Sequence, residues 1–356
     1  MRPALQRLRE RTNGYTVTPA EYVRVSYVAL GALTLIVLTG AAVRLTGSGL
    51  GCPTWPKCYG NVYPPLNTHA VIEFSNRLIT VPVSIAAGAA WLAALRRRPY
   101  RRDLTRLAAL LPLGVIGQAV LGGFTVKGAL DYGWVMGHFA LSMLILLAAV
   151  LLLWRASHER PASEQRAHAR RASEKDAASI LASARALPDR TLIRSLRGLA
   201  AFAALTIFAG TAATAAGPHA GGSPGQKINR LSFDGRGTMD FVIHRHAEIA
   251  FLFGLAAVGV WWLARRRDAP PLVQRALSVL CVLLALQGAV GLDQYETHLP
   301  TELVWVHVTL ACGVWLAALW AASAAGALEP RGARSAAERG PEGRLRPAAP
   351  LEFPGN

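Results

Sequence analysis

Long apolar runs without charged residues are the feature that most constrains how this chain folds. The first, Val25–Val43, contains no charged residue, and a run of about 20 apolar residues lets a helix cross the hydrocarbon core of a bilayer. In all, eight candidate spans lie at 25–44, 70–94, 104–124, 134–154, 197–216, 241–263, 272–292 and 303–323. With 52% hydrophobic residues in 356, the chain is too apolar for one soluble domain. We therefore predict an all-α polytopic membrane protein with eight transmembrane helices.

The basic residues are distributed in a way that indicates topology. The formal charge is +17, and arginines gather in the N-terminal segment, the even-numbered loops and the C-terminal tail. The third loop contains only Lys127, and the seventh (293–302) has neither lysine nor arginine. The positive-inside rule therefore places both termini and the even-numbered loops in the cytoplasm, in a multi-pass cell (plasma) membrane protein. Charge confined to these loops indicates a lipid bilayer as partner, and we predict no nucleic-acid partner.

Polar stretches divide the eight spans into two sets of four. Residues 1–24 form a cytoplasmic N-terminal segment, and residues 156–196 are rich in alanine, arginine, glutamate and serine, as in a cytoplasmic linker. Residues 324–356, rich in proline, glycine and arginine, have the composition of a disordered cytoplasmic tail. Four spans therefore lie in 25–155 and four in 197–323.

The register of these two halves repeats. The segment TGAAVRLTGSG at 39–49 resembles AGTAATAAGPH at 209–219. Three further correspondences keep the same offset to within one position: Gln118 and Gly122 with Gln287 and Gly291, Asn76 with His246, and His138 with His307. Four spans in register indicate a tandem repeat. The sequence thus predicts two tandem pseudo-symmetric four-helix bundles.

Four helix beginnings carry residues of ligand type at matching places, namely Asn76, His138, His246 and His307. Each is about five residues into its predicted helix, or roughly 7 Å below the outer interface. Ionisable groups inside a span usually face the bundle interior. Iron porphyrin requires apolar walls and axial imidazoles, and His246 and His307 supply such a pair. The alternative for any single histidine is a side chain that reaches from the helix end to the interface.

His244 competes with His246 for the ligand role. Two residues subtend about 200° around a helix, so both imidazoles cannot face one iron. The repeat register and the small Ala250 one turn away favour His246, and His244 then lies at the interface. Three other histidines lie in or beside outer loops, where they are solvated or meet haem propionates: His69, His219 and His298.

Glu73 and Arg77 are four residues apart on one face of the second span, with Asn76 between them. An ion pair within the helix and a functional role beside the predicted cofactor both fit this spacing. Glu248 is the nearest acid in the second half.

The first outer loop, SGLGCPTWPKCYGNVYPP, contains Cys52 and Cys58. Their separation in the sequence is not a common zinc spacing, and outside the cell a disulfide is favoured over free thiols. Cys281 and Cys312 are predicted to be ordinary packing residues.

Together these residues resemble the haem A synthase family. The motifs that carry the resemblance are GSGLGCPTWPKC at 47–58, IEFSNR at 72–77, the QxxxG helices, and the helices of His138, His246 and His307. The resemblance covers residues 25 to about 323 apart from the linker. It implies a membrane oxidoreductase that converts haem O to haem A, for terminal oxidases, by oxidising a ring methyl to a formyl group.

The resemblance also implies roles for particular residues. A haem b would be bound in the second half by His246 and His307, and the substrate haem O in the first half by His138, beside Asn76 and Arg77. Glu73 matches the family's functionally implicated carboxylate, and is the predicted catalytic residue. Cys52 and Cys58 match a loop pair linked to redox handling.

Two departures from the family pattern stand out. Asn76 occupies a place where many members have a histidine, so the substrate iron would have at most His138 as a strong ligand, with a position open for oxygen or water. The outer loop at 217–240 lacks a cysteine pair.

The implied partners are haem O, the farnesyltransferase that produces it and an electron donor, with a homo-oligomer as one option for the assembly. Two alternative functions fit the same sequence. A non-catalytic haem-binding electron carrier or oxidase-assembly protein would explain Asn76, and a transporter would explain the tandem repeat.

Overall fold

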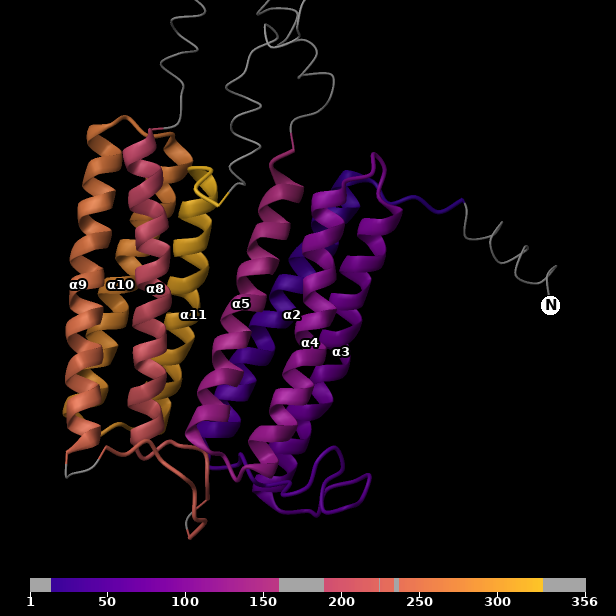
Figure 1. Cartoon of the computed structure of the whole chain (residues 1–356), viewed down its shortest axis with the longest axis vertical. Helices are drawn as coiled ribbons and strands as arrows, with labels where there is room; N and C mark the ends of the chain where they lie inside the picture. Colours follow the sequence, from indigo (N-terminus) through magenta and orange to yellow (C-terminus); the bar gives the residue numbers. More distant parts are fainter. Residues whose placement is uncertain (1–13, 160–188, 224, 234–236, 329–356) are drawn as a thin grey trace, which may run out of the picture.

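The computed structural model describes residues 14–159, 189–223, 225–233 and 237–328 (Figure 1). Within these ranges eight helices are long and apolar enough to cross a membrane, and no β-strand is formed. They are α2 (Pro19–Leu45), α3 (Thr68–Arg96), α4 (Arg102–Lys127), α5 (Tyr132–Ser157), α8 (Arg190–Ala216), α9 (Thr238–Arg266), α10 (Pro271–Glu296) and α11 (Thr301–Ala324). The prediction of eight membrane-spanning helices is confirmed.

Two helices begin several residues before the predicted spans because polar capping residues precede the apolar runs. Thr18 and Glu21 form a capping box, with Pro19 in the first helical turn. Asp189 accepts hydrogen bonds from the backbone N–H groups of Thr191 and Leu192 at the start of α8. Both helices therefore begin before the predicted boundaries at 24 and 196, whereas the division of the chain into domains remains a prediction. The remaining parts of the predicted N-terminal segment, linker and tail (1–13, 160–188 and 329–356) lie outside the described residues.

Helices α2–α5 pack together as one group and α8–α11 as a second, side by side in Figure 1. In the first group, α2 contacts α3 and α5, while α4 contacts α3 and α5. The second group repeats this order, with α8 against α9 and α11, and α10 against α9 and α11. The origin of the two groups as copies of one repeat remains a prediction from the sequence register.

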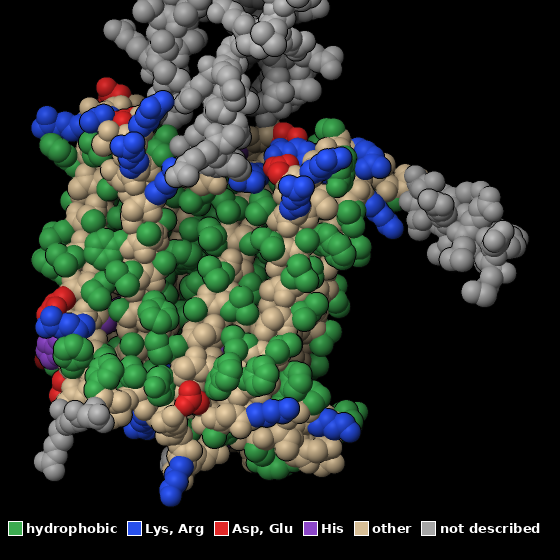
Figure 2. Space-filling view, in the orientation of Figure 1, with side chains coloured by type: hydrophobic (Ala, Val, Ile, Leu, Met, Phe, Trp, Pro, Cys, Tyr) green, Lys and Arg blue, Asp and Glu red, His purple; other side chains and the backbone are tan. Residues whose placement is uncertain are grey.

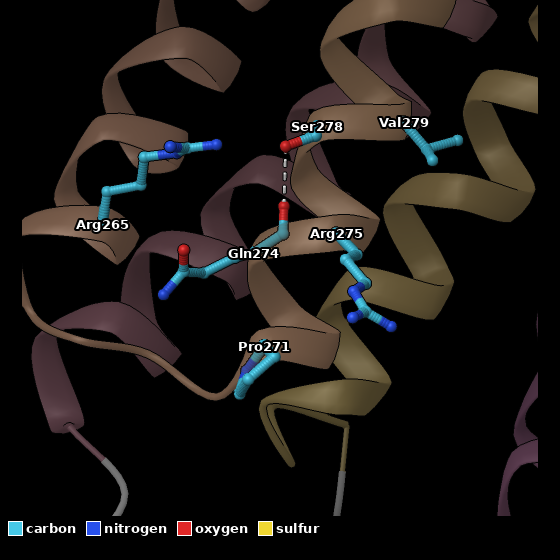
Figure 3. A pocket seen from close by; sticks show the side chains of 6 residues that line it. All are labelled: Arg265, Pro271, Gln274, Arg275, Ser278 and Val279. Carbon is cyan, nitrogen blue, oxygen red and sulfur yellow. Dashed lines mark hydrogen bonds between the residues drawn. The ribbon is translucent and has the colours of Figure 1, made fainter.

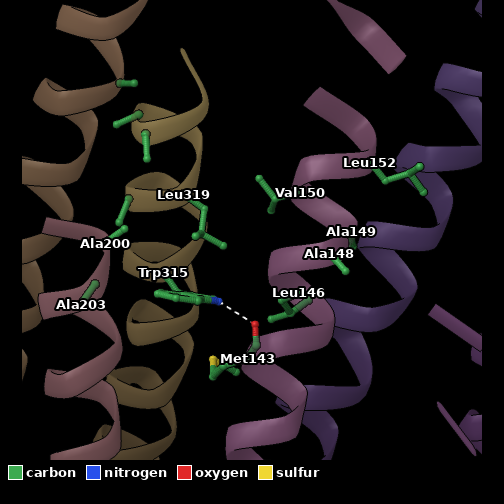
Figure 4. Packing of buried hydrophobic residues seen from close by; sticks show 14 of the residues in the cluster. Met143, Leu146, Ala148, Ala149, Val150, Leu152, Ala200, Ala203, Trp315 and Leu319 are labelled. Carbon is green, nitrogen blue, oxygen red and sulfur yellow. Dashed lines mark hydrogen bonds between the residues drawn. The ribbon is translucent and has the colours of Figure 1, made fainter. Parts of the chain in front are cut away.

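Helix α11 joins the two groups, because it packs against α2 and α5 as well as its own neighbours. The indole N–H of Trp315 donates to the carbonyl of Met143 on α5 at 3.1 Å (Figure 4). The indole N–H of Trp305 donates to the carbonyl of Leu38 on α2 at 3.2 Å. Indole donors satisfied by backbone carbonyls let aromatic side chains pack in apolar surroundings without an unpaired polar atom.

The loops that follow α2 and α8 also join the two groups of helices. The backbone N–H of Gly49 donates to the carbonyl of Gly221 at 2.9 Å, and the Ser223 hydroxyl donates to the carbonyl of Gly47 at 2.7 Å. Figure 2 shows a broad band of hydrophobic side chains between two ends where basic side chains gather. This pattern is that of a multi-pass membrane protein.

Candidate functional site

His246 on α9 and His307 on α11 face one another inside the second group of helices. Their ring centroids are 6.3 Å apart and the ring planes are inclined at 78°. The Nδ1 atoms of both imidazoles are buried and have no hydrogen-bond partner among the described residues. Two imidazoles with unused nitrogens, facing each other in apolar surroundings, are suited to binding a metal between them.

Glycines on the other two helices make room for these rings. A Cβ atom at Gly210 on α8 would lie 3.0 Å from Cε1 of His246, and one at Gly291 on α10 would lie 3.1 Å from Cε1 of His307. Any larger residue would press on the imidazole. Both histidines therefore depend on a glycine opposite them, and the sequence register had singled out only Gly291.

The spacing of the two rings fits an iron atom with two axial imidazoles. Each metal–nitrogen bond is about 2 Å and each ring centre lies roughly 1 Å beyond the nitrogen, which gives about 6 Å between centroids. The separation of 6.3 Å agrees with this. Two surface cavities, of about 530 and 290 Å³, lie elsewhere, and neither is lined by a histidine.

His244 lies on a different face of α9 from His246. Its imidazole is exposed, donates to the carbonyl of Asp240 at 2.7 Å and has its ring centroid 6.1 Å from that of Tyr295. Glu248 is likewise exposed and pairs with Arg245 at 2.7 Å. Neither side chain belongs to the facing pair.

The first half repeats the glycine-and-imidazole arrangement once, around His138 on α5. A Cβ atom at Gly122 on α4 would lie 3.4 Å from Cε1 of His138, whose Nδ1 is buried without a partner. The side-chain amide of Gln118, one turn from Gly122, donates to the carbonyl of His138 at 3.0 Å. This is the QxxxG pattern of the sequence.

Asn76, at the place of the second imidazole, is bonded to its neighbouring helix instead. Its Oδ1 accepts a hydrogen bond of 2.8 Å from the Thr39 hydroxyl on α2. The first half therefore presents one imidazole and one engaged amide, whereas the second half presents two imidazoles.

All four positions lie deeper along their helices than the sequence predicted. His138 and His307 are six residues past the first residues of α5 and α11, and Asn76 and His246 are eight residues past those of α3 and α9. At 1.5 Å per residue this is roughly 9–12 Å along each helix, against the roughly 7 Å expected. The difference arises because the helices begin in polar residues before the apolar runs.

Glu73 and Arg77 form the ion pair that their spacing predicts, with Oε1 of Glu73 2.5 Å from the guanidinium. Both also bind the outer loop. Oε2 of Glu73 accepts from the backbone N–H of Cys52 at 2.6 Å, and Arg77 donates to the carbonyls of Cys52 at 3.1 Å and Thr54 at 3.0 Å. Glu73 is only 6% exposed. The pair thus anchors the outer loop to α3.

A disulfide joins Cys52 and Cys58 in that loop. The loop lies tightly on the first half, since a Cβ atom at Gly51 would be 2.1 Å from the carbonyl oxygen of His69. Trp55, between the two cysteines, packs on Gly123 of α4, where a Cβ atom would be 3.1 Å from its ring. The disulfide loop is therefore held between the start of α3 and the end of α4, beside Gly122.

The three remaining outer histidines have no shared site. Nδ1 of His69 is hydrogen-bonded to the Ser48 hydroxyl at 3.0 Å, and Nε2 of His219 donates to the carbonyl of Leu299 at 2.8 Å. His298 is exposed.

Arg44 is a candidate functional residue that the sequence reasoning missed. It lies at the outer end of α2, its Nε is buried without a partner, and no carboxylate pairs with it in the part of the chain that the structure describes. Its Cγ lies 3.4 Å from where a Cβ atom of Gly221 would be, under the outer loop of the second half. One feature of the sequence could have identified Arg44: it is an arginine at the end of a predicted span with no acidic residue three or four positions away.

Comparison with known proteins identifies a family model and several relatives. A family model described as cytochrome oxidase assembly protein (COX15-CtaA) matches residues 23–319. The chain is 38% identical over 128 residues to a protein from Lysinibacillus sphaericus named Heme A synthase, covering 34% of this chain and 40% of that protein. A second Heme A synthase, from Bacillus pumilus, is 33% identical over 141 residues, covering 39% and 46%.

A longer alignment joins the chain to a Thermus thermophilus protein named Protoheme IX farnesyltransferase. The two are 28% identical over 331 residues, which cover 86% of this chain and 49% of that protein. The chain thus spans less than half the length of each of these three relatives.

The disulfide can be tested directly by peptide mass mapping of protein purified without reductant. We expect the peptides containing Cys52 and Cys58 to appear cross-linked, because the two sulfur atoms are bonded in the structure. Cys281 and Cys312 serve as internal controls and should be recovered as free thiols under denaturing alkylation. Alkylation of Cys52 and Cys58 without prior reduction would refute the bridge.

Proposed function

The chain belongs to the COX15-CtaA family of cytochrome oxidase assembly proteins, and we propose that it is a membrane haem A synthase. In this proposal it oxidises a ring methyl of haem O to the formyl group of haem A, for terminal oxidases. The observation that carries the proposal is the facing pair of His246 and His307, whose ring centroids are 6.3 Å apart and whose Nδ1 atoms are buried. The relatives named Heme A synthase supply the reaction class.

The second half would bind haem b as a resident cofactor. His246 and His307 are the residues that would hold it, and Gly210 and Gly291 leave space for their rings. When bound there, the haem would supply single-electron transfer. This half would therefore conduct electrons, and chemistry on the substrate would occur in the first half.

The first half would bind haem O as the substrate. His138 would be its one strong axial ligand, since Oδ1 of Asn76 is engaged by Thr39. Arg77 lies one residue beyond Asn76, but its guanidinium is directed to the outer loop. Arg44, buried without a carboxylate partner among the described residues, would pair with a porphyrin carboxylate, because an unpaired guanidinium in a span is costly.

The reaction removes electrons and protons together. Conversion of a methyl group and a water molecule to a formyl group releases four electrons and four protons. A route for electrons is needed next to the substrate, and the adjacent second half would provide it. Protons leave most readily towards the outer loops, since the ligand residues lie near that end of their helices.

Glu73 is the carboxylate that we propose to be required for this reaction. Its contacts favour an indirect role, in which it positions the loop that contains Cys52 and Cys58. Its two oxygens bind Arg77 and the N–H of Cys52. A buried carboxylate paired in this way holds the disulfide loop over the first half. The Cys52–Cys58 pair would then remain at a fixed place beside Gly122 and Trp55, as a redox pair would require.

The arginine-rich end of the helices would face the cytoplasm, with both termini, and the ligand residues would lie near the outer face. Residues 25–155 would form the substrate half and 197–323 the haem b half. The Thermus relative supports a farnesyltransferase as partner, because the matched region accounts for only 49% of a protein with that name. A close association would pass haem O directly from the farnesyltransferase to this chain. The other partner that the reaction requires, as balanced above, is an electron acceptor for the four released electrons, in place of the electron donor that the resemblance implied.

A non-catalytic haem-binding electron carrier is the second candidate function. The observation that favours it is Asn76, which removes one imidazole from the first half. Such a protein would retain the haem b pair and bind no haem O.

Haem extraction decides between these two functions. The full-length protein would be expressed with a haem O source, and acid-extracted haems separated by chromatography. We expect haem A together with haem b, whereas an electron carrier would yield haem b alone. A preparation with no Soret band would refute both functions.

The imidazole pair is tested by His246→Ala and His307→Ala, with His244→Ala as the matched control on the same helix. Either substitution in the pair should abolish the low-spin haem b spectrum, because one axial ligand is lost. His244→Ala should leave it unchanged, since that ring is exposed and faces elsewhere. Equal haem content in all three variants would exclude this pair as the ligands.

Glu73→Gln tests the loop-holding carboxylate, with Glu248→Gln as a control for loss of an acid within a span. Removing the charge leaves Arg77 without its partner at a cost of about 1–3 kcal/mol, which should displace the loop. Haem A yield should fall about tenfold or more, and the haem b spectrum should persist. Normal haem A yield from Glu73→Gln would exclude the role, and loss of haem b would indicate general misfolding.

A further inference from the structure

A groove of about 530 Å³ lies where the last turns of α9 meet the first turns of α10, at the arginine-rich end of the second half (Figure 3). It lies at the opposite ends of α9 and α10 from His246 and Gly291. Six residues line it: Arg265, Pro271, Gln274, Arg275, Ser278 and Val279. The first comes from α9 and the other five from α10.

Two guanidinium groups border the groove, and neither has an acidic partner among the described residues. Arg265 and Arg275 are both exposed, and no ion pair joins either to a carboxylate there. The neighbouring Arg267 differs, since it pairs with Asp189 at 2.9 Å. The groove therefore carries two uncompensated positive charges at the membrane boundary.

The walls of the groove are fixed by contacts between the two helices. The indole N–H of Trp261 on α9 donates to the Ser278 hydroxyl on α10 at 2.9 Å, and that hydroxyl donates to the carbonyl of Gln274 at 2.9 Å (Figure 3). The guanidinium carbon of Arg265 lies 4.5 Å from the ring centroid of Trp261. A cation held over an indole face is partly oriented before any ligand arrives.

Next to the charged rim, the surface is apolar and exposed. Val279 is 54% exposed and lines the groove, and Val282 one turn further along α10 is 59% exposed. Trp262 on α9 is 53% exposed. Exposed apolar side chains on a membrane-spanning helix face the acyl chains of lipids. The groove thus combines a doubly positive rim with an apolar strip leading into the bilayer.

We infer that this groove is a binding site for one anionic phospholipid. The phosphate would lie between Arg265 and Arg275, and an acyl chain would lie along Val279 and Val282. Basic pockets between transmembrane helices at the cytoplasmic side are suited to anionic lipid headgroups. A soluble anion would match the charges but not the apolar strip, so the groove favours a lipid.

The first half provides an internal comparison. Arg106 on α4 corresponds to Arg275 on α10 in the register of the sequence repeat. The arginine cluster around it is partly neutralised, because Arg101 pairs with Asp103 at 2.6 Å and Glu159 pairs with both Arg97 and Arg101. Arg106 is exposed like Arg275 but does not line the groove, so it can serve as a control position.

Native mass spectrometry of the full-length protein, released from nanodiscs of phosphatidylcholine and phosphatidylglycerol in equal amounts, tests the inference. The wild type should retain one phosphatidylglycerol in preference to phosphatidylcholine. In the double variant Arg265→Gln/Arg275→Gln, the preference for phosphatidylglycerol over phosphatidylcholine should fall roughly tenfold, because two interfacial charges are removed. Arg265→Lys/Arg275→Lys should keep most of it, and Arg106→Gln should behave as wild type.

Three results would overturn the inference. The first is an unchanged preference in the double glutamine variant with wild-type helical content by circular dichroism. The second is an equal loss in Arg106→Gln, which would show a general charge effect. The third is displacement of the bound lipid by millimolar inorganic phosphate, which would identify a site for free anions. If the double variant fails to fold, the single Arg275→Gln variant gives the same comparison.

Discussion

Hydrocarbon offers no hydrogen-bond partners to the backbone, and this constraint determines where this protein can hold functional groups. Each span must satisfy its own backbone as a continuous helix, so ligands have to come from helix faces rather than from loops. The three candidate axial histidines therefore lie on three different helices, α5, α9 and α11. Because the backbones of packed helices are a fixed distance apart, an imidazole fits between two helices only where the facing helix has a small residue. Gly122, Gly210 and Gly291 satisfy that requirement opposite His138, His246 and His307 respectively.

The same constraint accounts for the unusual partners of Glu73 and Arg77. Charged groups at the outer end of a span need polar atoms, and a neighbouring transmembrane helix has none to spare. The folded outer loop supplies them, through the N–H of Cys52 and the carbonyls of Cys52 and Thr54. In turn, the loop obtains a fixed position on α3 that its own short disulfide ring would not provide. The helix end and the loop stabilise each other, so neither is expected to be ordered alone.

The sequence predicted the features that depend on local pattern. Apolar run length predicted eight spans. Helical angle and repeat register favoured His246 over His244 as a ligand; the structure places the ring of His246 6.3 Å from that of His307, and the ligand role stays a prediction. Contacts between segments that lie far apart in the sequence were not predictable. The contacts of Glu73 require knowing that loop 52–58 folds back over α3, and the burial of Arg44 requires the loop of the other half. Helix starts at Pro19 and Arg190 were missed because capping by Thr18 and Asp189 extends a helix into polar sequence.

The two candidate sites differ at one position of the sequence register, where the first half has Asn76 and the second half has His246. In the second half Gly210 is needed, because a Cβ atom there would press on His246 at 3.0 Å. Gly40 is its counterpart in the first half. A Cβ atom there would have no heavy atom within 4 Å apart from the backbone of its own helix. The space that an imidazole would fill is thus retained beside α2, although Asn76 is shorter and turns to Thr39. A closed site with two imidazoles suits electron transfer, whereas a site with an open face suits a substrate that must react and then leave. In the proposed function one scaffold would therefore carry both tasks, and the shorter side chain of Asn76 would distinguish the substrate half from the haem b half.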